Sequence, residues 1–215
     1  MPEILNHKEI KFGKKVYYHR RTYFSKEMEH LATRAGKEYI GDGYECVVIG
    51  REGQERSVVA FKFPETWPEK AQPVFYLHKI LSTLFPHNFP RFHTVFYESP
   101  KDRMPAGSIR QRINGPNKDT LDDSEFEKLV KFKFSGIRSE LKKMGLSVSL
   151  DESIWNFAIG PDGGEYFLDS ARLQKNYPLN IRSVVKYMQE CKRYSPSDIR
   201  VVSRSITRLN HLLLS

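Results

Sequence analysis

The sequence LSVSLDESIWNFAIGPDGGEYFLDSARL, residues 146–173, contains the pattern that decides the fold. Within it, Asn156 follows Asp151 by five residues, and Asp169 follows Asn156 by thirteen. The pattern predicts that Asp151 opens a loop and Asn156 closes it. The apolar residues 166–168 (YFL) then form a short strand that returns the second aspartate beside the first two residues.

These three side chains match the needs of phosphoryl transfer. That reaction requires a carboxylate to orient or deprotonate the attacking hydroxyl, and oxygen ligands that hold magnesium against the phosphates. Asp151 is the candidate catalytic carboxylate, and Asn156 and Asp169 are the candidate metal ligands. A structural interpretation is also open on this segment alone, because Asp and Asn favour turns and Asp162-Gly163-Gly164 could simply turn a hairpin.

Upstream residues favour the catalytic interpretation. Residues 41–48 (GDGYECVV) have glycines at the first two positions of G-x-G-x-x-G-x-V, with Cys46 at the third and Val48 at the last. Fourteen residues after Val48, Lys62 stands in the apolar run VVAFKF, where its ammonium is costly unless it meets an anion. Each feature alone also fits an ordinary hairpin or an edge-strand lysine. Their common order and spacing indicate a kinase-type site.

From about residue 39 to about residue 173, the chain resembles a protein kinase reduced to its minimum. The resemblance implies an α+β, minimal bilobal protein-kinase-like fold, with a small antiparallel-sheet N-lobe carrying one helix and a reduced, mostly helical C-lobe. It also implies ATP and Mg²⁺ as cofactors. The implied nucleotide-binding residues are Gly41, Gly43, Val48, Lys62, Gln111, Ile113 and Asn156; the implied catalytic residues are Asp151 and Lys62, and the implied metal ligands are Asn156 and Asp169.

The chain departs from the kinase pattern at several positions. Ser149-Leu150 stand where His-Arg usually precede the catalytic aspartate, and Ser170-Ala171 stand where Phe-Gly usually follow the metal-binding one. By its spacing from Pro86-His87, His78 falls where kinases have the helix glutamate that pairs with the strand lysine, and Glu69 is the nearest upstream carboxylate. Only 46 residues follow Asp169, so we expect neither a full activation segment nor the usual large helical lobe.

The length, basic character and short C-lobe are similar to those of the HopBF family of bacterial type III effector kinases. That resemblance implies a virulence protein kinase that is secreted into the host cell cytoplasm and phosphorylates a hydroxyl side chain of the heat-shock protein 90 chaperone. Without it, the expected location is cytoplasmic. Two other functions remain open: a small-molecule phosphotransferase of the kinase-like fold, and a non-catalytic pseudokinase or basic binding module.

Composition fits one soluble domain. The chain has 215 residues, of which 39% are apolar and 13% aromatic, enough for a substantial core. We expect a monomer. We also expect no membrane span, since no apolar run approaches the roughly 20 residues that a spanning helix needs. The first residues also lack the apolar core of a cleaved secretory signal.

The net charge of +9 bears on the partners. Basic residues interleaved with tyrosines precede residue 35, a composition that could bind nucleic acid. No recognised nucleic-acid motif accompanies the charge, so we favour a solvated basic face or one that attracts an acidic protein.

Periodicity and turn residues predict the arrangement of the elements. We expect a basic N-terminal leader over residues 1–35, with a helix over 26–34, and a kinase domain over 36–215, with an N-lobe over about 36–114 and a C-lobe over about 115–215. Strands are predicted at residues 45–49, 57–63, 91–97 and 108–113. Helices are predicted at residues 74–84, 124–144, 181–194 and 196–213. Ser124 and Ser195 are the expected N-caps of the second and last helices, and Gly145 is expected to end the second. The second helix has an apolar stripe of Phe126, Leu129, Val130, Phe134, Ile137, Leu141 and Met144, and the last has one of Ile199, Val202, Ile206, Leu209 and Leu213.

Overall fold

The computed structural model describes residues 38–42, 46–50, 57–62, 71–96, 107–113, 123–151, 156–160, 162–169, 171–174 and 178–214. The helix expected over residues 26–34 lies outside these residues, as do Gly43, Glu69 and the lobe boundary expected at about residues 114 and 115.

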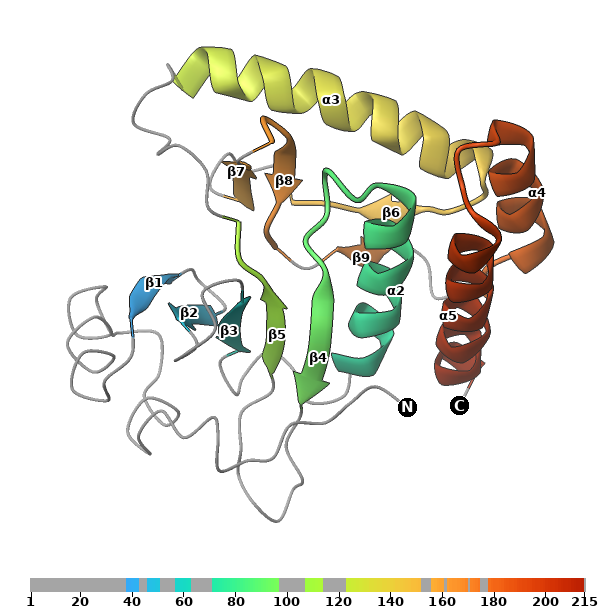
Figure 1. Cartoon of the computed structure of the whole chain (residues 1–215), viewed down its shortest axis with the longest axis horizontal. Coiled ribbons are helices and arrows are strands. Elements are labelled where there is room, and N and C mark those ends of the chain that lie inside the picture. Colours follow the sequence, from blue (N-terminus) through green and yellow to red (C-terminus); the bar gives the residue numbers. More distant parts are fainter. Residues whose placement is uncertain are drawn as a thin grey trace. The chain divides into compact units, whose positions relative to one another are not determined.

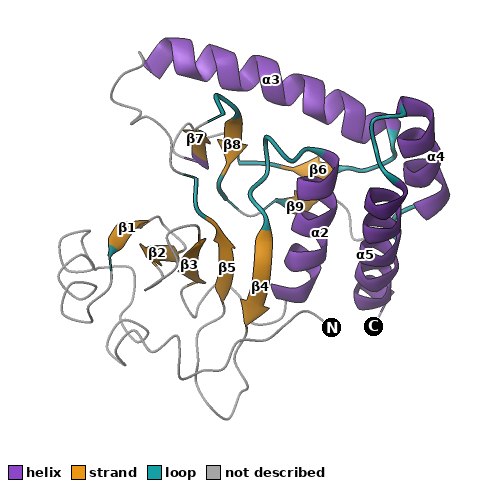
Figure 2. Cartoon of the chain, viewed as in Figure 1, coloured by secondary structure: helices purple, strands orange, loops and turns teal. Residues whose placement is uncertain are grey.

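The chain divides into two compact units. The first comprises Met1–Phe75 and Phe92–Arg112, and the second comprises Tyr76–Arg91 and Ile113–Ser215. The described part of the first unit is dominated by one antiparallel sheet, whereas that of the second is mostly helical (Figures 1 and 2). The expected α+β class, with a small antiparallel sheet followed by a reduced helical part, is confirmed.

The first unit contains a five-stranded sheet in the order β1-β2-β3-β5-β4, antiparallel throughout. Its strands are β1 (Tyr39–Asp42), β2 (Cys46–Gly50), β3 (Ser57–Lys62), β4 (Phe92–Phe96) and β5 (Gly107–Gln111). The four predicted strands are confirmed to within two residues, and β1 is an additional strand. Apolar and β-branched residues explain why β3 lies at the centre, since its run SVVAFK suits a strand with neighbours on both sides.

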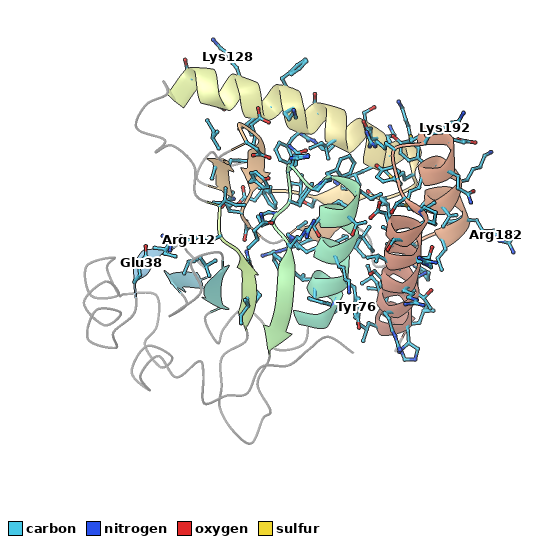
Figure 3. All side chains as sticks on the ribbon, in the orientation of Figure 1. Glu38, Tyr76, Arg112, Lys128, Arg182 and Lys192 are labelled. Atoms are coloured by element: carbon cyan, nitrogen blue, oxygen red, sulfur yellow. The ribbon has the colours of Figure 1, made fainter. Side chains whose placement is uncertain are left out.

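A bidentate ion pair joins the residue before β1 to the residue after β5. The Arg112 Nη1 and Nη2 atoms donate to the two Glu38 carboxylate oxygens at 2.6 Å each, and both residues are labelled in Figure 3. The hydrogen bond from Arg112 lowers the pKa of Glu38. A side chain at Gly50 would place its Cβ 2.8 Å from Glu38 Oε2, so the glycine permits this close approach.

Four helices are described: α2 (Ala71–Leu84), α3 (Asp123–Lys143), α4 (Ile181–Cys191) and α5 (Pro196–Leu214). The first begins three residues before the predicted residue 74. The second begins at Asp123, so Ser124 lies in the first turn rather than at the predicted N-cap, a difference within the usual uncertainty of helix ends. None of these described helices combines the length and apolar character needed to span a membrane.

Helix α3 ends where the sequence predicts. Gly145 has a φ of 76°, which lets the chain leave the helix in a left-handed turn. Leu146 N–H donates to Leu141 O at 2.8 Å and Gly145 N–H donates to Lys142 O at 3.0 Å, the two bonds of a Schellman motif. Among the described side chains, Val130, Phe134, Ile137 and Leu141 of α3 are buried, as is Met144 directly after it. They are five members of the predicted apolar stripe, and the side chains of Phe126 and Leu129 lie outside the described ones.

The last two helices have clear capping signals. Helix α4 stops at Cys191, three residues before the predicted end, because Lys192 adopts a left-handed conformation with a φ of 52°. Helix α5 has the predicted N-cap: Asp198 N–H donates to Ser195 Oγ at 3.2 Å, and Ser195 N–H donates to Asp198 Oδ2 at 2.9 Å.

Candidate active site

A short hairpin carries two of the candidate site residues. Strands β7 (Phe157–Ile159) and β8 (Glu165–Phe167) pair antiparallel, with Phe157 opposite Phe167. Gly163 turns the hairpin with a φ of 73°, as the Asp-Gly-Gly sequence predicts. The register places Asn156 opposite Leu168, and Leu168 N–H donates to Asn156 O at 2.7 Å. The residue before Asp169 is therefore bonded to the main chain of Asn156.

A second strand pair brings the loop of Asp151 to the same place. Strands β6 (Val148–Ser149) and β9 (Arg172–Leu173) were not predicted, and they pair with Ser149 opposite Arg172. The first leads into Asp151, and the second follows Asp169 by three residues. Figure 1 shows both two-stranded pairs in the part of the chain between α3 and α4. The segments that carry Asp151, Asn156 and Asp169 are thus joined by backbone pairing at both ends.

A side-chain hydrogen bond closes the loop between the first two residues. Asn156 Nδ2 donates to the Asp151 backbone oxygen at 3.0 Å. Asp151 is exposed, and Asn156 and Asp169 are partly exposed. The bond commits the amide nitrogen of Asn156, so this side chain has its Oδ1 atom to offer as a ligand.

The donor set fits a magnesium ion. Mg²⁺ prefers oxygen ligands, and protein sites commonly supply one or two carboxylates while phosphate and water complete the octahedron. The Asp169 carboxylate and the Asn156 amide oxygen match that preference. Within the described residues, no three His, Cys, Asp or Glu side chains gather in a metal-binding group.

A cluster of four phenylalanines packs around the hairpin. Its members are Phe89, Phe134, Phe157 and Phe167, each fully buried with 0% exposure. Phe134 of α3 lies with its ring centroid 4.8 Å from that of Phe157, 6.0 Å from that of Phe89 and 6.3 Å from that of Phe167. The two hairpin phenylalanines lie directly beside Asn156 and one residue before Leu168. Packing of this cluster therefore fixes the strands from which the site residues extend.

The loop after α2 docks on the same hairpin. Phe167 N–H donates to Asn88 O at 2.8 Å, and Asn88 Nδ2 donates to Glu165 O at 3.0 Å, so Asn88 bonds to the main chain of β8 through both its main chain and its side chain. At the hairpin turn, His87 Nδ1 lies 2.8 Å from Asp162 Oδ2. The hydrogen bond from His87, together with that from Gly164 N–H, lowers the pKa of Asp162.

His78 has a hydrogen-bond partner that its sequence position did not predict, and the suggested pairing with Lys62 stays a prediction. It is fully buried in α2, and its Nε2 accepts a hydrogen bond of 2.7 Å from Ala171 N–H, two residues after Asp169. Its sequence position suggested only a replacement for the helix glutamate beside Lys62. Its place between Leu77 and Ile80 in an apolar helix stripe was the signal that could have identified it as a buried residue with a polar partner.

The nucleotide-binding residues expected in the first unit lie on neighbouring strands. Gly41 in β1 is opposite Val48 in β2, and Lys62 at the end of β3 is opposite Cys46. Gln111 ends β5 opposite Ser57. Ile113 follows two residues later and is partly exposed. The sequence order thus brings the backbones of Gly41, Val48, Lys62 and Gln111 to one sheet, whereas Ile113 belongs to the second unit, and the roles assigned to their side chains stay predictions.

Comparisons with known proteins give only distant likenesses. No family model matches the chain, and no curated protein matches it. Among solved structures, the chain is similar to the GDP complex of a mutant aminoglycoside 2'-phosphotransferase-IIIa, with a TM-score of 0.38 and 10% identity over 87% of each chain. The GDP complex of the wild-type enzyme gives a TM-score of 0.36 and 10% identity, over 87% of this chain and 88% of the other.

Proposed function

We propose that this protein is a kinase-type phosphotransferase that moves a phosphoryl group from ATP to a hydroxyl group. The observation that carries the proposal is the joining of three loop segments by two strand pairs, with Asn156 Nδ2 bonded to Asp151 O at 3.0 Å. A turn-forming role alone would not require a carboxylate, an amide and a second carboxylate to be brought together from positions 151, 156 and 169.

Each residue has a distinct role in the proposed reaction. Asp151 is exposed and accepts the proton of the attacking hydroxyl, or orients that hydroxyl toward the phosphorus. Asp169 and Asn156 hold Mg²⁺ through oxygen atoms. When bound, the ion neutralises charge on the transferring phosphate. Lys62 provides the cation for the α- and β-phosphates, and Gly41, Gly43 and Val48 border the phosphates, as the kinase resemblance implies.

We also propose a protein as the substrate. The support is the resemblance of length, charge and reduced C-lobe to the HopBF effectors, which implies the heat-shock protein 90 chaperone as the acceptor and delivery into a host cell as the route. Exposure of Asp151 is compatible with a hydroxyl carried on a large molecule. The charge of +9 would favour an acidic protein surface.

Transfer of labelled phosphate tests the proposal. The purified chain is mixed with γ-labelled ATP and Mg²⁺, and then with purified heat-shock protein 90, a eukaryotic lysate, or a panel of small hydroxyl compounds. Label on protein supports the kinase proposal, and label on heat-shock protein 90 supports its finer form. Label on small compounds alone overturns the protein substrate while retaining phosphotransfer. No label in any arm overturns the enzymatic proposal in favour of a binding module.

Asp162, at the turn of the hairpin that precedes Asp169, provides the control. Asp169→Ala should abolish transfer, because it removes the carboxylate assigned to the metal. Asp162→Asn changes an exposed carboxylate at the hairpin turn, outside the proposed machinery, and should retain activity. Circular dichroism spectra should show both variants folded. Equal activity of the two variants would remove the metal role from Asp169.

A further inference from the structure

His78 is an unusual residue for its place in the fold. It lies on the inner face of α2 with 0% exposure, and its helix neighbours Leu77, Ile80 and Leu81 are 1%, 0% and 0% exposed. Its ring packs edge-on against Phe89, with centroids 6.3 Å apart and planes at 75°. A polar ring in such surroundings costs free energy unless its nitrogens form hydrogen bonds, so its bond to Ala171 has structural weight.

That bond reaches the segment that carries Asp169. Ala171 is itself fully buried, and its N–H donates to His78 Nε2 at 2.7 Å. On the other side of Asp169, Leu168 N–H donates to Asn156 O at 2.7 Å. The backbone is therefore held one residue before Asp169 and two residues after it. Asn156, directly before β7, accepts the bond before Asp169, and His78 of α2 accepts the bond after it.

We propose that His78 is a positioning residue for Asp169, a role that rests on the proposed function of that aspartate. Its Nε2 must carry a lone pair to accept from Ala171, so the ring is neutral with its proton on Nδ1. In this state the imidazole fixes the chain after Asp169, and with it the carboxylate relative to the Asn156 oxygen. His78 acts through the main chain and does not touch the substrate.

Two substitutions separate the hydrogen bond from the filling of space. His78→Leu keeps a buried side chain and removes the acceptor. His78→Gln restores an acceptor oxygen at about the reach of Nε2. Thr83→Ala, on the same helix, is the matched control, since the Thr83 hydroxyl bonds only within the helix, to Lys79 O at 2.7 Å.

Three measurements read the effect. Amide exchange followed by NMR should show that Ala171 loses at least roughly 10-fold protection in His78→Leu, while amides of α5 keep theirs. The rate of phosphate transfer at saturating ATP should fall roughly 10- to 100-fold, as is typical when a residue that orients a metal ligand is lost. His78→Gln should recover most of both effects, and Thr83→Ala should match the wild type.

Opposite results overturn the proposal. They are unchanged protection of Ala171 in His78→Leu, or a lost protection that leaves both the transfer rate and Mg²⁺–ATP affinity unchanged. If His78→Leu fails to fold, a long-range ¹H–¹⁵N spectrum of the wild type decides: a pyridine-like Nε2 supports the contact, and a protonated Nε2 overturns it. If the wild-type chain transfers no phosphate, the proposed function fails. Mg²⁺–ATP affinity of the His78 variants then decides the positioning role.

Discussion

Replacement of Phe134 by alanine should destabilise the protein far more than the same change at Phe132. Both residues lie in α3, two positions apart, and both changes give the helix the same gain in intrinsic propensity. Phe134 is 0% exposed and is surrounded by Phe89, Phe157 and Phe167, whereas Phe132 is 80% exposed. The difference between the two variants therefore isolates burial in the aromatic cluster.

The expected magnitude follows from that burial. A buried phenylalanine truncated to alanine typically costs about 3–5 kcal/mol, and an exposed substitution changes stability by about 0.5 kcal/mol or less. For a chain of this size the larger value corresponds to a fall in Tm of roughly 6–20 °C. Urea unfolding followed by circular dichroism gives the free energies, and a thermal scan gives Tm. Losses of similar size in the two variants would refute the idea that this cluster anchors the hairpin of Asn156 and Asp169.

Three further predictions concern chemistry, pH and regulation. Asp151→Asn should lower the rate of transfer by roughly 10²–10⁴-fold and preserve ATP affinity, measured by steady-state kinetics and calorimetry; a lost affinity with an unchanged rate would contradict the base role. Because the pKa of Asp162 is lowered in the folded state, its carboxylate stabilises the fold above its unfolded pKa, and this stability is lost as pH falls through the folded pKa. Asp162→Asn should therefore flatten the fall of the urea unfolding midpoint below about pH 4. An unchanged slope of midpoint against pH would count against this prediction. Phosphatase treatment of the protein expressed in bacteria should leave specific activity unchanged, because only residues 170–180 separate Asp169 from α4; a large fall that preincubation with ATP reverses would reveal a phosphorylation switch.

The sequence predicted most elements whose signals are local. Residues close together in the sequence encode several features, and the structure has them where expected: the apolar stripes of α3 and α5, the glycine that ends α3 and the Ser195 cap. At the β7–β8 hairpin, the sequence predicted the strand over residues 166–168, and the Asp-Gly-Gly turn was the structural alternative for this segment. The spacing of Asp151, Asn156 and Asp169 indicated that their loops meet, and the two strand pairs show how.

Other features depend on contacts between distant segments and were not predictable. Strands β6 and β9 have two residues each, too few to show the alternation of apolar and polar residues that predicts a strand. They form because Ser149 pairs with Arg172, which is distant in the sequence. The docking of Asn88 on Glu165 and Phe167 is of the same kind. For His78, the kinase spacing suggested a lysine partner, which stays a prediction, and its bond to Ala171 N–H joins segments too far apart in the sequence to be predicted.

These contacts fix the backbone on both sides of Asp169. Asp169 stands in a short connection whose backbone is bonded to Asn156 on one side and to His78 on the other, and the same hairpin is packed by a cluster of four phenylalanines. In the proposed function, these main-chain bonds hold the Asp169 carboxylate in place, so the site would need no long loop that becomes ordered on phosphorylation. Loss of the packing at Phe134 or of the acceptor at His78 should impair this placement by different routes, the first through global stability and the second through the local backbone alone.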